Sequence, residues 1–275
     1  MPAPSGLAIA RFPAQGKPWA TMAFGSAMGV RQEFYAPFAR YLAENGIHVV
    51  TFDYEGMGAS RAGPMSQVRA DVMKWSRDLD AMLGEARAMA PGLPLLFMGH
   101  SLGGQLLGVL SRNAGVAAAL TVTAGSGWYR FNDRMALQVR IFWFLAIPAL
   151  TPLFGYFPGK ALRMVGDLPA GVARQWRRWC LDRDYLLCEP DARAAFERVR
   201  APILAYSFED DPMITRRAVD ALHAAYGAAR VERRHVAPAD VGERYIGHFA
   251  FFAPRSRETL WPYPLGWLRD AVKAS

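Results

Sequence analysis

The chain has 275 residues, which is enough to bury a large core as one domain or as one domain with an insertion. Its composition of 52% hydrophobic and 20% charged residues indicates a globular protein and excludes a disordered one. The formal net charge of +8 favours anionic partners, although an arginine-rich soluble protein would also carry it. Because no basic block or nucleic-acid-binding motif accompanies this charge, we expect no nucleic-acid partner.

Two cysteines, Cys180 and Cys188, are too few for a disulfide framework, so we expect a reduced, cytoplasmic protein. The first residues have neither a charged region nor a long apolar one, and no signal peptide is indicated. No histidine pair or Cys/His cluster has metal-ligand spacing, and no phosphate-binding G-K-[ST] motif occurs. We therefore expect no metal and no cofactor.

Apolar segments alternate with helical patterns along most of the chain, which is typical of βαβ units and a largely parallel sheet. The expected strands are 6–12, 19–24, 47–52, 93–98, 116–123, 202–207 and 229–236. The expected helices are 34–44, 68–89, 105–110, 215–226 and 260–272, the last with a start delayed by Pro262 and Pro264.

Residues 126–189 lack this alternation and are rich in Trp, Phe, Arg and Pro. They contain nine Lys or Arg against five Asp or Glu, which is half of the excess charge of the chain. We interpret them as a helical cap inserted over the carboxyl edge of the sheet. The core would then consist of residues 1–125 and 190–275.

One part of this cap, residues 141–157, contains no charged side chain and is interrupted by Pro148, Pro152 and Gly155. Our first interpretation is a pair of lid helices folded over a pocket. The second is a lid that dips into a membrane surface, flanked by Arg140 and Lys160, and the third is a membrane span, for which the segment is short.

The pentapeptide Gly99-His100-Ser101-Leu102-Gly103 follows an expected strand and precedes an expected helix. A strand, a sharp turn and a helix around G-x-S-x-G form a nucleophile elbow, which exposes the serine hydroxyl at the edge of a sheet. Glycines on both sides allow the crowded backbone of such a turn. We therefore expect Ser101 to be a nucleophile.

A serine nucleophile needs a base, and the base needs an acid that orients it. The acid is expected after a late strand, where Glu209-Asp210-Asp211-Pro212 stands. We favour Asp211 as the acid. Asp210 is the alternative acid, although it could instead serve the turn. Either carboxylate could instead be a plain helix cap or turn residue.

His248 is the expected base, because it lies in a glycine-preceded loop after the last strand. The four other histidines have structural explanations. His48 begins a strand, His223 lies within a helix, His235 is packed in the last strand, and His100 belongs to the elbow and points away from the serine.

An oxyanion needs two donors. The backbone N–H of Leu102 supplies one, and the loop after residue 24 supplies the other, with Ala27 as first choice and Ser26 as the next. An apolar acyl pocket, or packing of the lid, is the expected role of Trp128, Phe142, Trp143, Phe144 and Phe154. The arginines of the cap, such as Arg174, Arg177 and Arg178, leave room for an anionic headgroup or CoA.

Together these residues resemble the α/β-hydrolase superfamily over nearly the whole chain outside 126–189. Asp53 to Ser60 is similar to its D-x-x-G-x-G-x-S turn, and Gly247-His248-Phe249 to its catalytic-histidine loop. The base loop is also similar to that of a group of serine hydrolases with Gly-His-x-Gly/Ala-Phe-Phe. One departure is Phe24-Gly25, where the superfamily usually has His-Gly. The resemblance implies an α/β-hydrolase fold and hydrolase chemistry but no particular substrate.

The sequence thus predicts a serine hydrolase, a carboxylesterase or thioesterase, that acts on a small-molecule acyl ester or thioester through an acyl-enzyme on Ser101. Two alternatives remain. The same triad could serve an acyltransferase or a peptidase-like enzyme, and the same fold could be a non-catalytic binding or membrane-surface protein. The sequence leaves the oligomeric state open.

Overall fold

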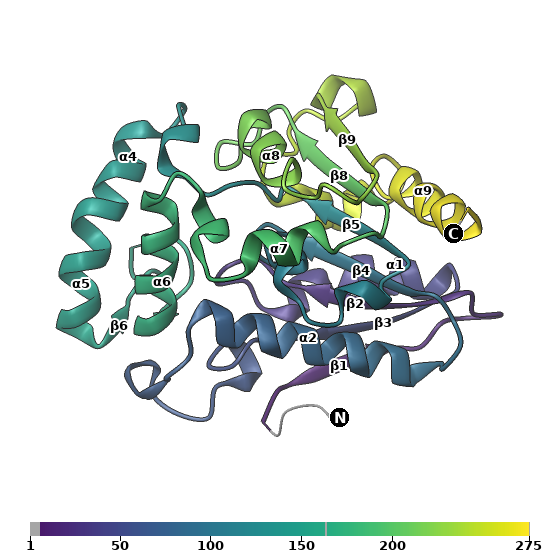
Figure 1. Ribbon diagram of the computed structural model, residues 1–275, viewed down its shortest axis with the longest axis horizontal. Coiled ribbons are helices and arrows are strands. Elements are labelled where there is room, and N and C mark those ends of the chain that lie inside the picture. Colours follow the sequence, from purple (N-terminus) through teal and green to yellow (C-terminus); the bar gives the residue numbers. More distant parts are fainter. Residues whose placement is uncertain (1–5, 163, 275) are drawn as a thin grey trace.

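The computed structural model describes residues 6–162 and 164–274 (Figure 1). Its centre is a seven-stranded sheet with the order β1-β3-β2-β4-β5-β8-β9. β1 pairs antiparallel with β3, and the other pairs in this sheet are parallel. The strands are β1 (Ile9–Phe12), β2 (Ala20–Gly25), β3 (Ile47–Phe52), β4 (Leu95–His100), β5 (Ala118–Val122), β8 (Ile203–Phe208) and β9 (Val231–Val236).

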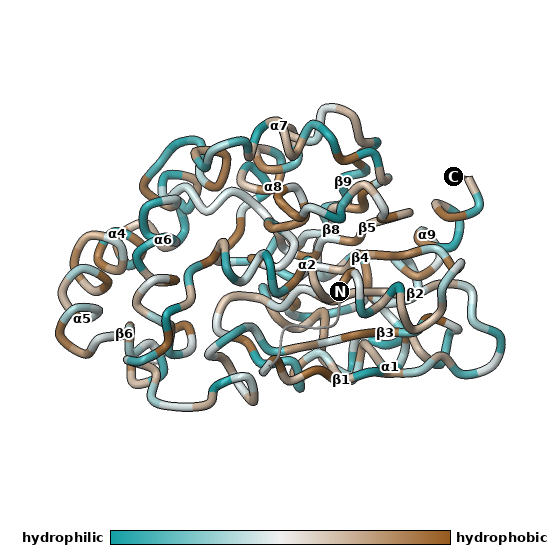
Figure 2. The backbone as a smooth tube through the Cα atoms, turned by 60° about the horizontal axis from the view of Figure 1, so that its bottom comes forward, coloured by the Kyte–Doolittle hydropathy of each residue, from teal (hydrophilic) through white to brown (hydrophobic). Residues whose placement is uncertain are grey.

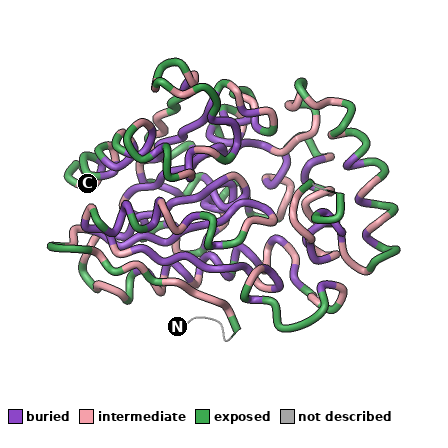
Figure 3. The backbone as a smooth tube through the Cα atoms, turned by 180° about the vertical axis from the view of Figure 1, so that it is seen from behind, coloured by how far each residue is buried: buried purple, intermediate pink, exposed green. Residues whose placement is uncertain are grey.

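Helices cover both faces of the sheet (Figure 1). On one face α2 (Val72–Met89), α7 (Ala192–Glu197) and α8 (Arg216–His223) contribute to one apolar cluster. On the other face α1 (Ala36–Glu44) and α9 (Pro262–Lys273) pack in a second cluster. Because both faces are covered, β2, β4, β5 and β8 are buried along their full length, as Figure 3 shows in purple.

The α/β-hydrolase fold predicted from the sequence is confirmed, with small shifts of most boundaries. The expected last helix, 260–272, forms as α9, and its start is delayed only as far as Pro262, which is its first residue; Pro264 lies within the first turn. Proline has no N–H to lose in the first turn of a helix, and its fixed φ suits that position. The expected helix at 105–110 is displaced. A short α3 (Leu102–Gln105) begins directly after Ser101, and a 3₁₀ turn (Leu106–Val109) follows it.

Residues 126–189 contain a bundle of helices that stands beyond one end of the sheet (Figure 1). α4 (Ala136–Ile141), a π-helical turn (Phe142–Ala146) and α5 (Ile147–Phe154) follow one another without a break. The apolar segment is therefore part of one long helix, and its helical partner is α6 (Ala170–Leu181) rather than a second half of itself. A small hairpin, β6 (Tyr156–Phe157) and β7 (Leu168–Pro169), joins the two.

Candidate active site

Ser101 lies on a strained turn between β4 and α3. Its φ of 50° and ψ of −117° fall outside the backbone regions that residues other than glycine normally adopt. The turn is held from both sides, because the Ser101 N–H donates to the Val122 carbonyl at 2.9 Å and the Ser101 carbonyl accepts from the Gln105 N–H at 3.0 Å. The hydroxyl is thus fixed at the carboxyl edge of the sheet, as an elbow requires.

Close backbone contacts explain two glycines of the motif. A Cβ on Gly103 would lie 2.1 Å from the Gly25 carbonyl oxygen, and a Cβ on Gly99 would lie 2.4 Å from the Gly104 Cα. Real Cβ atoms do not approach other atoms so closely. The absence of side chains therefore lets the elbow press against the end of β2, and it brings the loop that begins at Ser26 next to Ser101.

His248 and Asp211 form a buried pair. The His248 Nδ1 lies 2.8 Å from the Asp211 Oδ2, and both side chains are almost completely buried. A carboxylate can only accept, so Nδ1 carries the hydrogen and Nε2 keeps a lone pair that can accept a proton. The other oxygen of Asp211 accepts the N–H groups of Met213 and Ile214, which fixes the carboxylate.

The neighbouring carboxylate, Asp210, has a different task. Its two oxygens accept the backbone N–H groups of Ile246 at 2.8 Å and Gly247 at 3.0 Å. Asp210 therefore holds the loop that carries the imidazole of His248, while Asp211 orients the imidazole itself. The sequence predicted a turn role for Asp210 but did not reveal that the turn is that of the histidine loop.

His100 joins the elbow to the same loop. Its Nε2 lies 2.9 Å from the carbonyl oxygen of His248, and its Nδ1 lies 2.9 Å from the hydroxyl of Tyr35. The Tyr35 oxygen in turn accepts the Ala27 N–H at 2.8 Å. One placement of the hydrogens satisfies all three hydrogen bonds. The Ala27 N–H donates to the Tyr35 oxygen, the Tyr35 O–H donates to the His100 Nδ1, and the His100 Nε2–H donates to the His248 carbonyl.

Burial keeps the His100 ring neutral. Desolvation lowers the pKa of His100 well below its usual value, and the nearby His248 lowers it further. The two rings are 5.0 Å apart between centroids, which places the His248 imidazole beside the elbow. No hydrogen bond joins the Ser101 hydroxyl to His248 within residues 6–162 and 164–274. In free enzymes such bonds are often long and tighten only when substrate is bound.

Known proteins resemble this chain in sequence and in structure. Residues 16–145 match the family model described as "Serine aminopeptidase, S33". Over 94 residues the chain is 39% identical to the protein named "Putative monoglyceride lipase" from Schizosaccharomyces pombe, a match that covers 33% of this chain and 24% of that protein. The chain therefore matches about a quarter of the length of this curated relative.

Solved structures share the fold across almost the whole chain. A soluble variant of monoglyceride lipase from Saccharomyces cerevisiae superposes with a TM-score of 0.73 and 16% identity, covering 96% of this chain and 91% of that one. A carboxyl esterase from Bacillus coagulans gives a TM-score of 0.68 and 14% identity, covering 97% and 94%. These likenesses show that the chain has the α/β-hydrolase fold.

The turn at Asp53 to Ser60 has a structural role. The Asp53 carboxylate accepts the N–H groups of Gln32 and Ala59, each at 2.9 Å, and the Ser60 hydroxyl donates to the Asp53 carbonyl. Burial raises the pKa of Asp53, and these hydrogen bonds oppose the rise. The turn thus anchors the segment at Gln32 that leads from the Ser26 loop into α1.

The remaining histidines hydrogen-bond within the fold. His48 Nδ1 accepts the Ala14 N–H, and His235 Nδ1 pairs with the Ser207 hydroxyl. His223 is buried between the hydroxyl of Thr121 and the Val219 carbonyl, at 2.9 and 2.8 Å. Desolvation lowers the pKa of His223 to about 4.

The aromatic residues expected to form an acyl pocket are spread over the cap. Phe142 and Trp143 are buried against α6, with the Trp143 ring 4.7 Å from that of Trp176. Phe144 is 53% exposed and contacts Tyr129. Trp128 is partly buried. Phe142 and Trp143 thus form the core of the cap, and Phe144 contributes to its surface.

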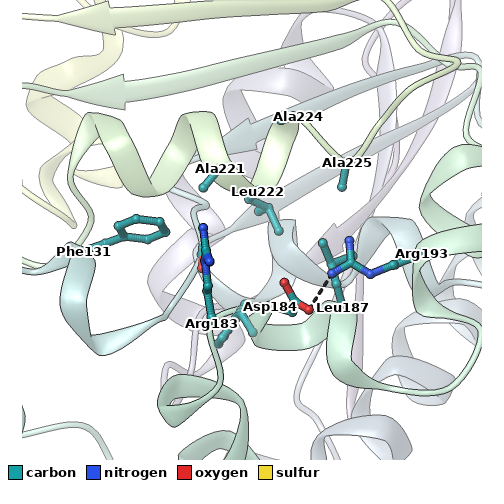
Figure 4. A pocket seen from close by; sticks show the side chains of 11 residues that line it. Phe131, Arg183, Asp184, Leu187, Arg193, Ala221, Leu222, Ala224 and Ala225 are labelled. Carbon is teal, nitrogen blue, oxygen red and sulfur yellow. Dashed lines mark ion pairs between the residues drawn. The ribbon is translucent and has the colours of Figure 1, made fainter.

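A cavity of about 320 Å³ lies between α8 and residues 183–187, where the cap ends (Figure 4). Arg183, Asp184 and Arg193 line its polar side, and Arg193 pairs with Asp184. Ala221 and Leu222 of α8 line the other side, together with Ala224 and Ala225, which follow this helix (Figure 4). Ser101 and His248 are not among its lining residues, so this cavity is separate from the candidate active site.

The main residue missed by the sequence analysis is Tyr35. It stands just before α1 and looks like one more apolar residue in a helical pattern. Nothing local in the sequence indicates that its hydroxyl connects the Ala27 backbone to His100.

Proposed function

We propose that this chain hydrolyses carboxylic esters through an acyl-enzyme on Ser101. The observation that carries the proposal is the buried His248–Asp211 pair, 2.8 Å apart, beside a serine on a strained elbow. The similar structures named monoglyceride lipase and carboxyl esterase support the same reaction class.

In the first half-reaction the Ser101 oxygen attacks the acyl carbon while Nε2 of His248 takes the hydroxyl proton. The carbonyl π electrons move to the oxygen and form an oxyanion. Asp211 stabilises the imidazolium through Nδ1. When the oxyanion collapses, the bond from the acyl carbon to the leaving oxygen breaks, and His248 gives its proton to that oxygen.

In the second half-reaction water takes the place of the leaving alcohol. His248 removes a proton from the water as its oxygen attacks the acyl carbon of the Ser101 ester. The new oxyanion collapses, the bond to the Ser101 oxygen breaks, and this oxygen recovers the proton from His248. A carboxylic acid leaves, and the enzyme returns to its starting state.

For the oxyanion donors we propose the backbone N–H groups of Leu102 and Ser26. Leu102 begins α3, where N–H groups lack intrahelical acceptors. Ser26 replaces our first choice, because the Ala27 N–H donates to Tyr35. Ser26 directly follows Gly25, and the backbone of Gly25 packs against Gly103 of the elbow. The buried hydroxyl of Ser26 has no hydrogen-bond partner within the described residues.

The substrate class proposed is a small acyl ester, with monoacylglycerols as the first to test because two of the similar proteins carry that name. Thioesters share the same attacked carbon and remain in the proposal. Hydrolysis of p-nitrophenyl esters of increasing acyl length, of a monoacylglycerol and of an acyl-CoA would rank the leaving groups.

The test compares wild type with Ser101→Ala and with the control Ser66→Ala, which changes a serine outside the site. We expect Ser101→Ala to lower kcat by about 10⁴-fold or more and the control to leave it unchanged. Full activity in Ser101→Ala would refute the nucleophile. A folded wild type without turnover on any of these esters would favour the non-catalytic alternative.

A second candidate is peptide-bond cleavage, favoured by the description of the matching family model as a serine aminopeptidase. The acyl-enzyme chemistry is the same, with an amine as leaving group. Turnover of aminoacyl p-nitroanilides that is lost in Ser101→Ala would support it. Transfer of the acyl group to added alcohols or amines in preference to water would instead indicate an acyltransferase.

A further inference from the structure

The long helix of the cap carries an apolar stripe on its outer side. We define the cap stripe as Leu137, Ile141, Phe144, Leu145 and Leu153, which are between 49% and 73% exposed. Their spacing places them on one face of the helix. From Ile141 to Phe154 every exposed position of this helix is apolar. Surface helices of soluble domains normally show the opposite pattern, with polar residues facing the solvent.

The inner face of the same helix is held by the protein. Phe142, Trp143 and Ile147 are buried, and the Arg177 Nε of α6 donates to the Trp143 carbonyl at 2.6 Å. Within the described residues, Ala136–Phe154 is the helix long and apolar enough to cross a membrane, with 22% of its apolar window buried. Since α6 covers one side with aromatic and arginine side chains, the helix is built to lie on a surface rather than to cross it.

Basic side chains flank the cap stripe at both ends. Between Asp133 and Asp167 the chain contains no Asp or Glu. The exposed side chains of Arg134 and Arg140 lie at one end of the helix, and that of Lys160 follows the other end. An apolar face with basic residues beside it is the pattern of helices that lie in the interface of a membrane with anionic lipids.

The position of the stripe agrees with such a role. α4 and α5 form one end of the molecule, opposite the C-terminus (Figure 1). Figure 2 shows their hydrophobic segments in brown at this end, and Figure 3 shows the same helix largely exposed.

We propose that the cap stripe docks the protein on a membrane surface that contains anionic lipids. The apolar side chains enter the boundary between headgroups and acyl chains, and the basic side chains contact the phosphates. A second copy of the chain fits this face less well. Pairing two stripes would bring Arg140 and Lys160 of both copies to one apolar interface, without an acidic side chain from 134–166 to neutralise them.

The experiment measures co-sedimentation with vesicles of phosphatidylcholine alone and of phosphatidylcholine with phosphatidylglycerol. Because binding is the readout, the result does not depend on the proposed hydrolysis. We expect wild type to bind the anionic vesicles at least about tenfold more tightly than the neutral ones, and less tightly as salt rises.

Two pairs of variants separate the apolar and the charged contributions. Leu145→Asp and Leu153→Asp should weaken binding about tenfold or more, whereas Ala228→Asp, an exposed control far along the chain, should not. Arg140→Gln and Lys160→Gln should each weaken binding to anionic vesicles about fivefold, whereas Lys17→Gln should have little effect. Circular dichroism would show that each variant is folded.

Three results would overturn the proposal. The first is a folded wild type that does not bind anionic vesicles. The second is undiminished binding of Leu145→Asp and Leu153→Asp. The third is a dimer in analytical ultracentrifugation that Leu145→Asp dissociates, without vesicle binding by wild type, because the stripe would then be an interface between copies.

Discussion

The Nε2 of His100 lies 2.9 Å from the carbonyl oxygen of His248, although 148 positions separate the two residues. The residue before the elbow serine therefore holds the main chain of the loop that carries His248. Through Tyr35, the same ring also reaches the backbone at Ala27. One buried, neutral imidazole thus connects the Ser101 turn, the His248 loop and the loop that begins at Ser26.

The two neighbouring carboxylates should respond differently to loss of charge. In Asp211→Asn the amide can keep its place but no longer favours the tautomer of His248 with the hydrogen on Nδ1, so kcat should fall by about 10⁴-fold with little loss of stability. In Asp210→Asn one acceptor for the loop N–H groups is lost. The free energy of unfolding should fall by about 1–3 kcal/mol, and kcat by less than about 10²-fold.

Ester hydrolysis and urea denaturation of both variants check this pair. The assignment of orienting and holding roles would be contradicted by equal losses of kcat, or by a larger loss in Asp210→Asn.

Tyr35→Phe removes one oxygen that serves two partners. The Ala27 N–H and the His100 Nδ1 would both lose a buried hydrogen bond, which should lower the free energy of unfolding by about 1–3 kcal/mol. Because the loops at the elbow lose a shared anchor, kcat should also fall by about tenfold. The matched control is Tyr41→Phe, since the Tyr41 hydroxyl makes no hydrogen bond within the described residues.

Urea denaturation and steady-state hydrolysis measure the two effects of Tyr35→Phe. If this variant and Tyr41→Phe behave alike, the Tyr35 hydroxyl does not connect the loops in solution.

The buried histidines should make the protein less stable in mild acid. The pKa of His223 is about 4 in the folded protein and about 6.5 in an unfolded chain. Between these values the unfolded state binds the proton and the folded state does not, so the free energy of unfolding falls as the pH falls. From pH 7.5 to pH 5 this one group should contribute a loss of about 2 kcal/mol. His100 acts in the same direction.

The measurement is urea denaturation at both pH values for wild type and His223→Gln. The uncharged amide should remove the contribution of His223, so the variant should lose about 2 kcal/mol less than wild type over this interval. Equal losses in the two proteins would show that His223 is not buried as a neutral ring.

Much of the fold could be predicted because it depends on local patterns. The predicted strand at 47–52 coincides with β3, since a short run rich in β-branched residues that follows the Asn45-Gly46 turn favours a strand. The Ser101 turn was predictable for a similar reason, because strand, glycines and helix all lie within a few residues. The exact start of α9 was not, since the effect of a proline depends on which turn of the helix it occupies.

The less predictable parts depend on contacts between distant segments. The task of Asp210 follows from two N–H groups 36 and 37 positions away, and that of Tyr35 from a histidine 65 positions away. Ala27 was the first choice for an oxyanion donor because its loop is rich in small residues, but a tyrosine hydroxyl from the next segment takes its N–H. Pairings of this kind leave no periodic signal in a sequence.

The most direct measurement is covalent labelling of the folded protein with a fluorophosphonate, followed by mass spectrometry of the peptides. The account predicts one phosphonylated residue, Ser101, with a labelling rate that falls about 10³-fold or more in His248→Asn and with no label in Ser101→Ala. A folded wild type that stays unlabelled, or an equal rate in His248→Asn, would contradict the claim that His248 activates Ser101.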